Sequence, residues 1–255
     1  MSNKKTKKQS IITYDNKGEQ ALRKEMHDLL ERCPIPQDQI LSNLGLFLNS
    51  KNLSRILFMN HIYQKTLNVP GVVFEFGTRW GQNVALFTAL RGIYEPFNRH
   101  RKIVAFDTFE GFPSIHPKDG LSPMMEQGML SLTDGYENYL KEVVGNIEQD
   151  NPLSHINKFD VRKGNGPDQL SSYLEEHPET IISLAYFDFD LYEPTKKCLE
   201  IIKPRLTKGS VVGFDELNDP DSPGETLALM EVFGLNNINL VRFPYASRVS
   251  YFVVE

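Results

Sequence analysis

Residues 71–94 read GVVFEFGTRWGQNVALFTALRGIY. The run at 71–77 is short, apolar, rich in β-branched residues and closed by a glycine, which is typical of a buried parallel strand. Residues 82–94 are apolar on most sides, as expected of a helix that packs on a sheet. A strand, a glycine turn and a helix in this order predict the first unit of a parallel α/β sheet.

Similar patterns continue along the chain. Four more strand-like runs are KIVAFDTF (102–109), INKFDVRKG (156–164), IISLAYFDFD (181–190) and SVVGFDE (210–216). A helix is expected at 194–206, where Pro194 suits the first turn and Gly209 follows as a C-cap. Residues 239–243 and 250–255 predict a closing hairpin. Together they indicate an α/β fold with a doubly wound, mostly parallel, seven-stranded Rossmann-like sheet that ends in an antiparallel hairpin.

The N-terminal part of the chain has a different pattern. Residues 1–10, MSNKKTKKQS, are basic and are not followed by an apolar segment, so we expect a disordered tail rather than a secretory signal. Residues 11–65 predict a helical lead-in. The main domain is expected at 66–255. Its segment 110–140 is too long for a tight crossover, which indicates a lid over the site.

Composition limits the classes of function. The 255 residues carry a net charge of −5, which argues against a broad nucleic-acid-binding face. No apolar run reaches the roughly 20 residues of a membrane span. The two cysteines, Cys33 and Cys198, lie far apart, which favours a reduced, cytoplasmic protein. The expected partner is a small-molecule or saccharide acceptor, and a homo-oligomer is left open.

Acidic residues stand where the predicted strands end. The set comprises Glu75, Asp107, Asp188 and Asp190, and Asp215 and Glu216. Because the carboxyl ends of parallel strands meet at one edge of a sheet, we expect these side chains to line a common rim.

The glycine loop at 77–83, GTRWGQN, indicates the kind of ligand. It lacks the middle glycine of a dinucleotide-binding loop and the lysine of a P-loop. A looser turn with acidic neighbours favours S-adenosylmethionine, which has no phosphate and carries a positive sulfonium. Asp107 is placed to accept hydrogen bonds from the two ribose hydroxyls.

Asp188 and Asp215 lie one strand–helix–strand unit apart and should leave adjacent strands side by side. Asp190 and Glu216 add two more carboxylates, and four close carboxylates repel unless a cation or a shared proton neutralises them. A hard divalent cation such as Mg²⁺ fits such oxygen ligands. The alternative is that Asp190 caps the next helix and Glu216 is solvated, which leaves no metal site.

The segments GVVFEFGTRWGQN, IVAFDTFEGFP and YFDFDLYEPTKKCLEIIKPRLTKGSVVGFDE, in this order, resemble the macrocin O-methyltransferase (TylF/MycF-type) family. Its members are class I sugar O-methyltransferases that depend on S-adenosylmethionine and Mg²⁺. The resemblance covers 70–255 and is most specific at 107–113 and 188–195. Two departures are Glu216, where the family usually has aspartate, and the order Arg79–Trp80, which is reversed in the family.

The resemblance, together with the position of each residue after a predicted strand, implies roles for particular residues. Asp188, Asp215 and Glu216 would bind the metal, and Asp188 or Asp190 would accept the proton of the acceptor hydroxyl. Asn165 is a weaker candidate, for the edge of the adenine. The candidate cofactor-binding residues are Glu75, Phe76, Gly77, Thr78, Arg79, Gly81, Asn83, Asp107, Thr108, Phe109, Asn165 and Asp188.

Two other classes of function stay open at this point. One is a nicotinamide-dependent oxidoreductase on a related sheet, which the missing middle glycine argues against. The other is a non-catalytic, methyltransferase-like binding subunit, which the complete set of rim acids argues against. For a methyltransferase, the acceptor could be a nucleotide sugar, a polysaccharide terminus, a glycosylated natural product or a catechol.

Overall fold

The computed structural model describes residues 16–255. The chain divides into two compact units, the first ending at Arg55 and the second running from Ile56 to Glu255. The tail predicted at 1–10 and the first residues of the predicted lead-in lie outside the described residues. The division lies inside helix α2 (Ser50–Lys65), and the domain limits expected at 65 and 66 stay predictions.

The first unit contains helix α1 (Lys17–Glu31), the 3-10 turns Gln37–Gln39 and Leu41–Phe47, and the start of α2. A capping box begins α1: the Asn16 side chain accepts the Glu19 N–H at 3.0 Å, and the Glu19 carboxylate accepts the Asn16 N–H at 2.8 Å. None of residues 16–55 is buried. The apolar face of α1 is exposed, and it consists of Leu22, Met26, Leu29 and Leu30.

The second unit is built on a seven-stranded sheet in the order β3-β2-β1-β4-β5-β7-β6. The strands are β1 (Val72–Phe76), β2 (Ile103–Asp107), β3 (Phe159–Lys163), β4 (Ile182–Phe187), β5 (Leu206–Phe214), β6 (Val241–Arg242) and β7 (Ser250–Val253). Strands β1 to β5 are parallel, and β7 is antiparallel to both β5 and β6. The predicted fold class, including the closing hairpin, is therefore confirmed.

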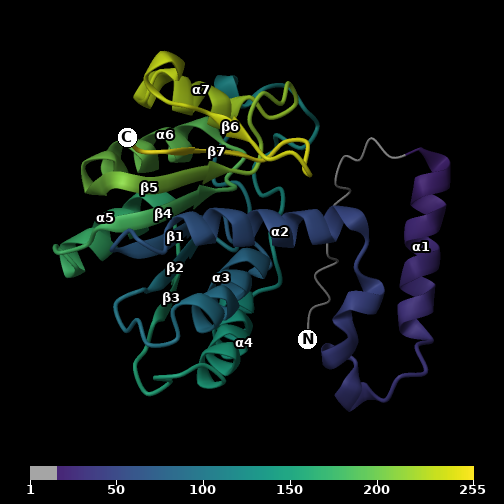
Figure 1. The fold of residues 1–255 in the computed structure, drawn as a ribbon. Coiled ribbons are helices and arrows are strands. Elements are labelled where there is room, and N and C mark those ends of the chain that lie inside the picture. Colours follow the sequence, from purple (N-terminus) through teal and green to yellow (C-terminus); the bar gives the residue numbers. More distant parts are fainter. Residues whose placement is uncertain (1–15) are drawn as a thin grey trace. The chain divides into compact units, whose positions relative to one another are not determined.

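Helices cover both faces of this sheet (Figure 1). They are the second half of α2, α3 (Gln82–Tyr94) and α4 (Tyr136–Gln149) on one face, and α5 (Gly166–Glu176), α6 (Tyr192–Ile202) and α7 (Gly224–Val232) on the other. Successive strand residues alternate between the faces, so Val73 packs with α3 while Phe74 and Phe76 pack with α5 and α6. No helix within the described part of the chain is long and apolar enough to span a bilayer.

The sequence-based prediction was wrong around β5. This strand begins at Leu206, so Gly209 lies inside it with a φ of 91° instead of capping the preceding helix. The pairing of β4 and β5 shifts register between Ile182 and Leu184, and the Ser210 hydroxyl bridges the irregularity by donating to the Ile182 carbonyl at 2.7 Å. A bulge of this kind accommodates the glycine. Helices α5 and α7 were also not predicted.

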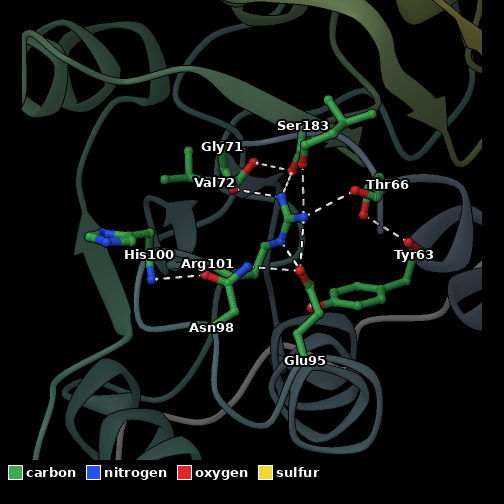
Figure 2. Close-up of polar contacts among 10 residues, drawn as sticks. Tyr63, Thr66, Gly71, Val72, Glu95, Asn98, His100, Arg101 and Ser183 are labelled. Carbon is green, nitrogen blue, oxygen red and sulfur yellow. Dashed lines mark hydrogen bonds and ion pairs between the residues drawn. The ribbon is translucent and has the colours of Figure 1, made fainter.

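A buried arginine ties together the amino-terminal edge of the sheet (Figure 2). The Arg101 side chain is 1% exposed, and its Nη1 donates to the Gly71 carbonyl at 2.6 Å and to the Ser183 hydroxyl. Its Nε donates to Glu95 at 2.8 Å, and Glu95 also accepts the Tyr63 hydroxyl at 2.7 Å. The charge is thus paired and hydrogen-bonded, which makes its burial tolerable.

The topology brings three strand ends together at the opposite edge. The chain runs from β1 through β2 to β3 on one side, then returns to β4 and β5 on the other side of β1. This reversal is the switch point at which doubly wound sheets bind ligands. In register, Phe76 pairs with Phe187, which pairs with Phe214. The residues after β1, β4 and β5 therefore lie next to one another.

Candidate active site

Asp188 and Asp215 lie side by side at the ends of β4 and β5, as the sequence predicted. The Asp188 N–H donates to the Phe76 carbonyl at 2.8 Å, and the Asp215 N–H donates to the Phe187 carbonyl at 2.9 Å. These bonds extend the parallel ladder by one residue past each strand. The Asp215 carboxylate also accepts the buried Tyr186 hydroxyl at 2.9 Å, which orients it.

Asp190 and Glu216 join this pair to form an acidic rim. The Asp190 and Glu216 carboxyl groups lie close enough for the charge of Glu216 to act on the ionisation of Asp190. Burial raises the pKa of Asp190 well above its usual range, and the negative charges of Glu216 and Asp188 raise it further. The alternative that Asp190 caps the next helix is wrong, because Leu191 holds the N-cap position of α6.

Arg248, from the loop between β6 and β7, supplies a positive charge to the rim. Its guanidinium binds the Glu216 carboxylate, and it lies 3.2 Å from Asp219 and 3.8 Å from Asp215. Within residues 16–255, no three acidic, histidine or cysteine side chains are placed to hold a metal ion together. No sequence pattern indicates a role for Arg248, because its loop has only the pattern of a hairpin turn.

Glu225, in the first turn of α7, is a second residue of the site that was not predicted from the sequence. Its side chain is completely buried, and burial raises its pKa well above the usual range, with Glu216 and Asp188 adding to the effect. Its carboxylate accepts the backbone N–H of Phe189 at 2.9 Å. No local pattern marks this glutamate, since helix α7 itself was not predicted.

Asp107 joins the loops that follow β1 and β2. One carboxylate oxygen accepts the Arg79 N–H at 2.7 Å, and the other accepts the Phe109 N–H at 2.5 Å. Arg79 and Phe109 have positive φ values of 48° and 55°, so the two loops are sharply turned toward this side chain. Burial raises the pKa of Asp107, and the two amide donors oppose that shift. A carboxylate has about four lone-pair positions, so acceptor capacity remains for a ribose hydroxyl.

The remaining residues predicted to bind the cofactor lie around these loops. Glu75 is completely buried in β1, and Thr78 and Asn83 are 4% exposed. The Thr108 hydroxyl donates to the Gly111 carbonyl at 2.8 Å, which shapes the loop after β2. Asn165 precedes α5 at the end of β3, one strand further out. All of them lie at the same edge of the sheet, and their roles in cofactor binding stay predictions. The others in that set are Phe76, Gly77, Arg79, Gly81, Asp107, Phe109 and Asp188.

The segment 110–140 is anchored to the helices behind the acidic rim. One oxygen of the buried Asp119 carboxylate accepts the His116 N–H at 2.6 Å, and the other accepts the N–H of Tyr192 at 2.6 Å. Lys118 forms an ion pair with Glu231 of α7. These contacts connect the segment to α6 and α7, and its role as a lid stays a prediction.

Comparison with known proteins identifies relatives among solved structures. No protein-family profile and no curated protein matches the chain. The crystal structure of the calicheamicin methyltransferase CalS11 is 42% identical, with 94% of each chain covered and a TM-score of 0.92. The apo structure of CalS11, a TDP-rhamnose 3′-O-methyltransferase of calicheamicin biosynthesis, is 39% identical, with 95% of this chain and 96% of that chain covered and a TM-score of 0.84. The O-methyltransferase NovP is 18% identical with a TM-score of 0.59, and it shares the fold.

These matches decide between the classes of function left open by the sequence. An oxidoreductase and a non-catalytic subunit are excluded, because identities of about 40% extend over nearly the whole of both chains. The rim of acids and the loops joined by Asp107 lie at the switch point where such a sheet binds its ligands. The chain therefore belongs to the CalS11 family of S-adenosylmethionine-dependent O-methyltransferases.

Proposed function

We propose that this enzyme transfers the methyl group of S-adenosylmethionine to a hydroxyl of a nucleotide-linked sugar, with TDP-rhamnose as the representative acceptor. The observation that carries this proposal is the 39% identity, over 95% of the chain, to an enzyme that methylates TDP-rhamnose. The acidic rim supports it, because a sugar hydroxyl must be oriented and deprotonated before it can attack. Membership of the macrocin-type subfamily and a cytoplasmic location are further proposals, which rest on the sequence alone.

The residues of the loops after β1 and β2 fit the cofactor. When bound, S-adenosylmethionine supplies a methyl group on a positively charged sulfur. Asp107 offers partly buried carboxylate oxygens to the ribose, and it is already held in place by two amides. Glu75 and Gly77 would line the methionine end. The nearby carboxylates favour the sulfonium charge electrostatically.

Proton removal is assigned to the acidic rim. Asp188 or Asp190 would accept the proton of the sugar hydroxyl, because both follow β4 at the edge where the acceptor must approach the methyl group. Glu216, whose charge acts on Asp190, offers a second carboxyl group close by. Water must be kept from this region, and the anchored segment 110–140 is the part of the chain proposed to do so.

We also propose that the enzyme uses Mg²⁺, held by Asp188, Asp215 and Glu216. The donor chemistry fits, since all three side chains offer hard oxygen ligands and their charge exceeds that of Arg248. The cation would lower the pKa of a ligated hydroxyl and orient neighbouring oxygens. In the described arrangement Arg248 binds Glu216, so cation binding requires this arginine to move away.

The acceptor is tested by incubating the purified enzyme with labelled S-adenosylmethionine and TDP-rhamnose. Free rhamnose, a catechol and a rhamnosylated natural product serve as comparison acceptors. We expect the nucleotide sugar to gain one methyl group by mass spectrometry, with the label in the sugar. Transfer to one of the comparison acceptors instead, or to none of the four, would contradict the proposed acceptor.

We further propose that the first unit packs against a second copy of the chain. The described residues of this unit, 16–55, bury none of their side chains, so they form no core of their own that could stabilise them. Helix α1 is net positive at 17–25 and net negative at 26–31, so two antiparallel copies would place opposite charges together. Its apolar face has Leu22 and Leu29 seven residues apart, the spacing of one helical stripe.

Molecular mass in solution tests this association. We expect light scattering to give a multiple of the 29.2 kDa chain mass for the wild type, and a smaller particle for the double variant Leu22→Gln, Leu29→Gln. Leu121→Gln is the matched control, since Leu121 is fully exposed in the second unit. A monomeric wild type would rule out the second copy as the occupant of this face.

A further inference from the structure

A buried glutamate outside the predicted site holds the turn that follows β4. One Glu225 oxygen accepts the backbone N–H of Phe189 at 2.9 Å and that of Asp190 at 3.3 Å. The other oxygen is buried and has no hydrogen-bond partner among the described residues. Glu225 thus connects the first turn of α7 to the two residues that follow Asp188.

The turn at residues 188–190 is strained, so it needs stabilising contacts from another part of the chain. Asp190 has a φ of 62°, in the left-handed region that costs a non-glycine residue on the order of 1 kcal/mol. The two amides of the turn point away from the strand ladder, and the Glu225 carboxylate is the acceptor that both of them reach. Without that acceptor the two amides lose these hydrogen bonds, and the left-handed conformation of Asp190 is less strongly stabilised.

Close packing at the neighbouring glycine brings the helix to the turn. A Cβ atom on Gly224 would lie 2.6 Å from the Tyr192 nitrogen and 2.9 Å from the Asp190 carbonyl oxygen. A side chain at this position would push α7 away from the turn. Gly224 therefore lets the following residue, Glu225, reach the two amides.

We propose that Glu225 is a positioning residue of the active site, which fixes the turn 188–190 and thereby holds the Asp190 carboxyl beside Glu216. This proposal rests on the proposed role of Asp188 and Asp190 as the acceptors of the substrate proton. It assigns Glu225 no contact with cofactor or acceptor.

Two substitutions of Glu225, one that keeps its reach and one that shortens it, distinguish a positioning role from a purely structural one. A buried carboxylate close to other carboxylates destabilises the fold, because it is desolvated and repelled. Glutamine would accept the same two amides through its side-chain carbonyl and carry no charge. Aspartate would keep the carboxyl group but is one methylene shorter, so it would not reach both amides.

The test compares Glu225→Gln, Glu225→Asp and the wild type, with Glu200→Gln as a control on the exposed face of α6. The first readout is hydrogen–deuterium exchange of the peptide spanning 187–192. The second is kcat and KM with TDP-rhamnose. The third is S-adenosylhomocysteine affinity by calorimetry, which reports on the loops after β1 and β2 and on Asp188, whose N–H is bound by Phe76 and not by Glu225.

We expect Glu225→Asp to speed exchange at 187–192 and to lower kcat by about 10- to 100-fold, as a displacement of about 1 Å does in active sites. The S-adenosylhomocysteine affinity should change by less than about twofold, a few tenths of a kcal/mol. Glu225→Gln should keep wild-type exchange and most of kcat.

Wild-type exchange and kcat in Glu225→Asp would overturn the proposal. So would a loss in Glu225→Gln as large as that in Glu225→Asp, because charge rather than reach would then matter. A wild-type enzyme that does not methylate TDP-rhamnose contradicts the proposed acceptor instead, and the exchange comparison then decides on Glu225 by itself.

Discussion

A Cβ atom on Gly77 would lie 1.9 Å from the carbonyl oxygen of Asp188. The loop after β1 therefore passes directly against the backbone of the acidic rim, and Gly77 also has a φ of 85°. This contact joins the part of the site proposed to hold the methionine end of the cofactor to the part proposed to deprotonate the acceptor. Both parts of the site therefore depend on a glycine at position 77.

Gly77→Ala is expected to lose S-adenosylhomocysteine binding by at least about tenfold, because the added methyl group forces the loop away from Asp188 and is strained at a positive φ. Isothermal titration calorimetry measures the affinity. Gly45→Ala is the matched control, since a Cβ atom there meets no atom within 4 Å. Unchanged affinity in Gly77→Ala would mean that this loop does not form the cofactor site.

Asp188→Asn and Asp190→Asn separate the two candidate bases. The residue that accepts the proton should lose about 10²- to 10⁴-fold in kcat when it becomes an amide. The affinity for S-adenosylhomocysteine should stay near that of the wild type in the Asp190 variant. Asp150→Asn, an exposed aspartate after α4, is the control. If both variants turn over at the wild-type rate, the proton goes to another group.

Divalent cations and Arg248 are expected to compete for the same carboxylates. Arg248 is about half exposed, and loss of its charge removes roughly 1 kcal/mol of competition, about a fivefold change in affinity. Arg248→Gln should therefore bind Mn²⁺, a spectroscopic substitute for Mg²⁺, more tightly by electron paramagnetic resonance. Arg242→Gln on β6 is the control.

Excess chelator provides the complementary measurement for the wild type. We expect the chelator to abolish methyl transfer and added Mg²⁺ to restore it. Without the cation, the acidic rim would have no Lewis acid to orient the acceptor hydroxyl. Full activity in chelator, together with no Mn²⁺ binding by either protein, would show that Arg248 alone balances the rim.

Arg101→Leu tests the buried cluster at the other edge of the sheet. Removal of the guanidinium leaves Glu95 and several backbone carbonyls without their donor, so we expect a loss of about 3–5 kcal/mol in the free energy of unfolding. Urea denaturation measures it. Arg99→Leu, an exposed arginine two residues earlier, should change it by less than about 0.5 kcal/mol.

The same cluster gives a pH dependence. Burial opposes ionisation of Glu95, but the hydrogen bonds from Arg101 and Tyr63 outweigh it and lower its pKa below the ordinary value of 4.5. Stability from this group is therefore present above about pH 4.5 and is lost as the pH falls through the lower folded-state pKa. Wild-type stability should fall more steeply below pH 4.5 than that of Arg101→Leu. Parallel curves of stability against pH for the two proteins would mean that Arg101 does not lower the pKa of Glu95.

Much of the fold could be predicted because local patterns of apolar residues indicate its strands. Strands buried on both faces appear as continuous apolar runs, and the five parallel strands and the hairpin were found in this way. Of their order, only the adjacency of β4 and β5 was predicted, because right-handed crossovers restrict the possible orders without fixing the return of the chain from β3 to β4 beside β1. Helix α7 was missed because it is short and apolar on most sides, so it has almost no periodicity. Helix α5 was not predicted although its apolar residues Leu170, Tyr173 and Leu174 lie on one face. Gly209 was misplaced because a bulge in a strand and a helix cap both require glycine at positive φ.

The sequence by itself determined which chemistry is possible at the edge of the sheet: Asp107, Asp188 and Asp215 each follow a strand, and parallel strands end at one edge. Only the tertiary structure decided which distant groups complete the site. Arg248 and Glu225 reach the rim from a hairpin loop and a helix whose positions depend on how the last part of the chain packs. Periodicity describes neighbours along a chain, whereas contacts across such distances are set by the packing of whole elements.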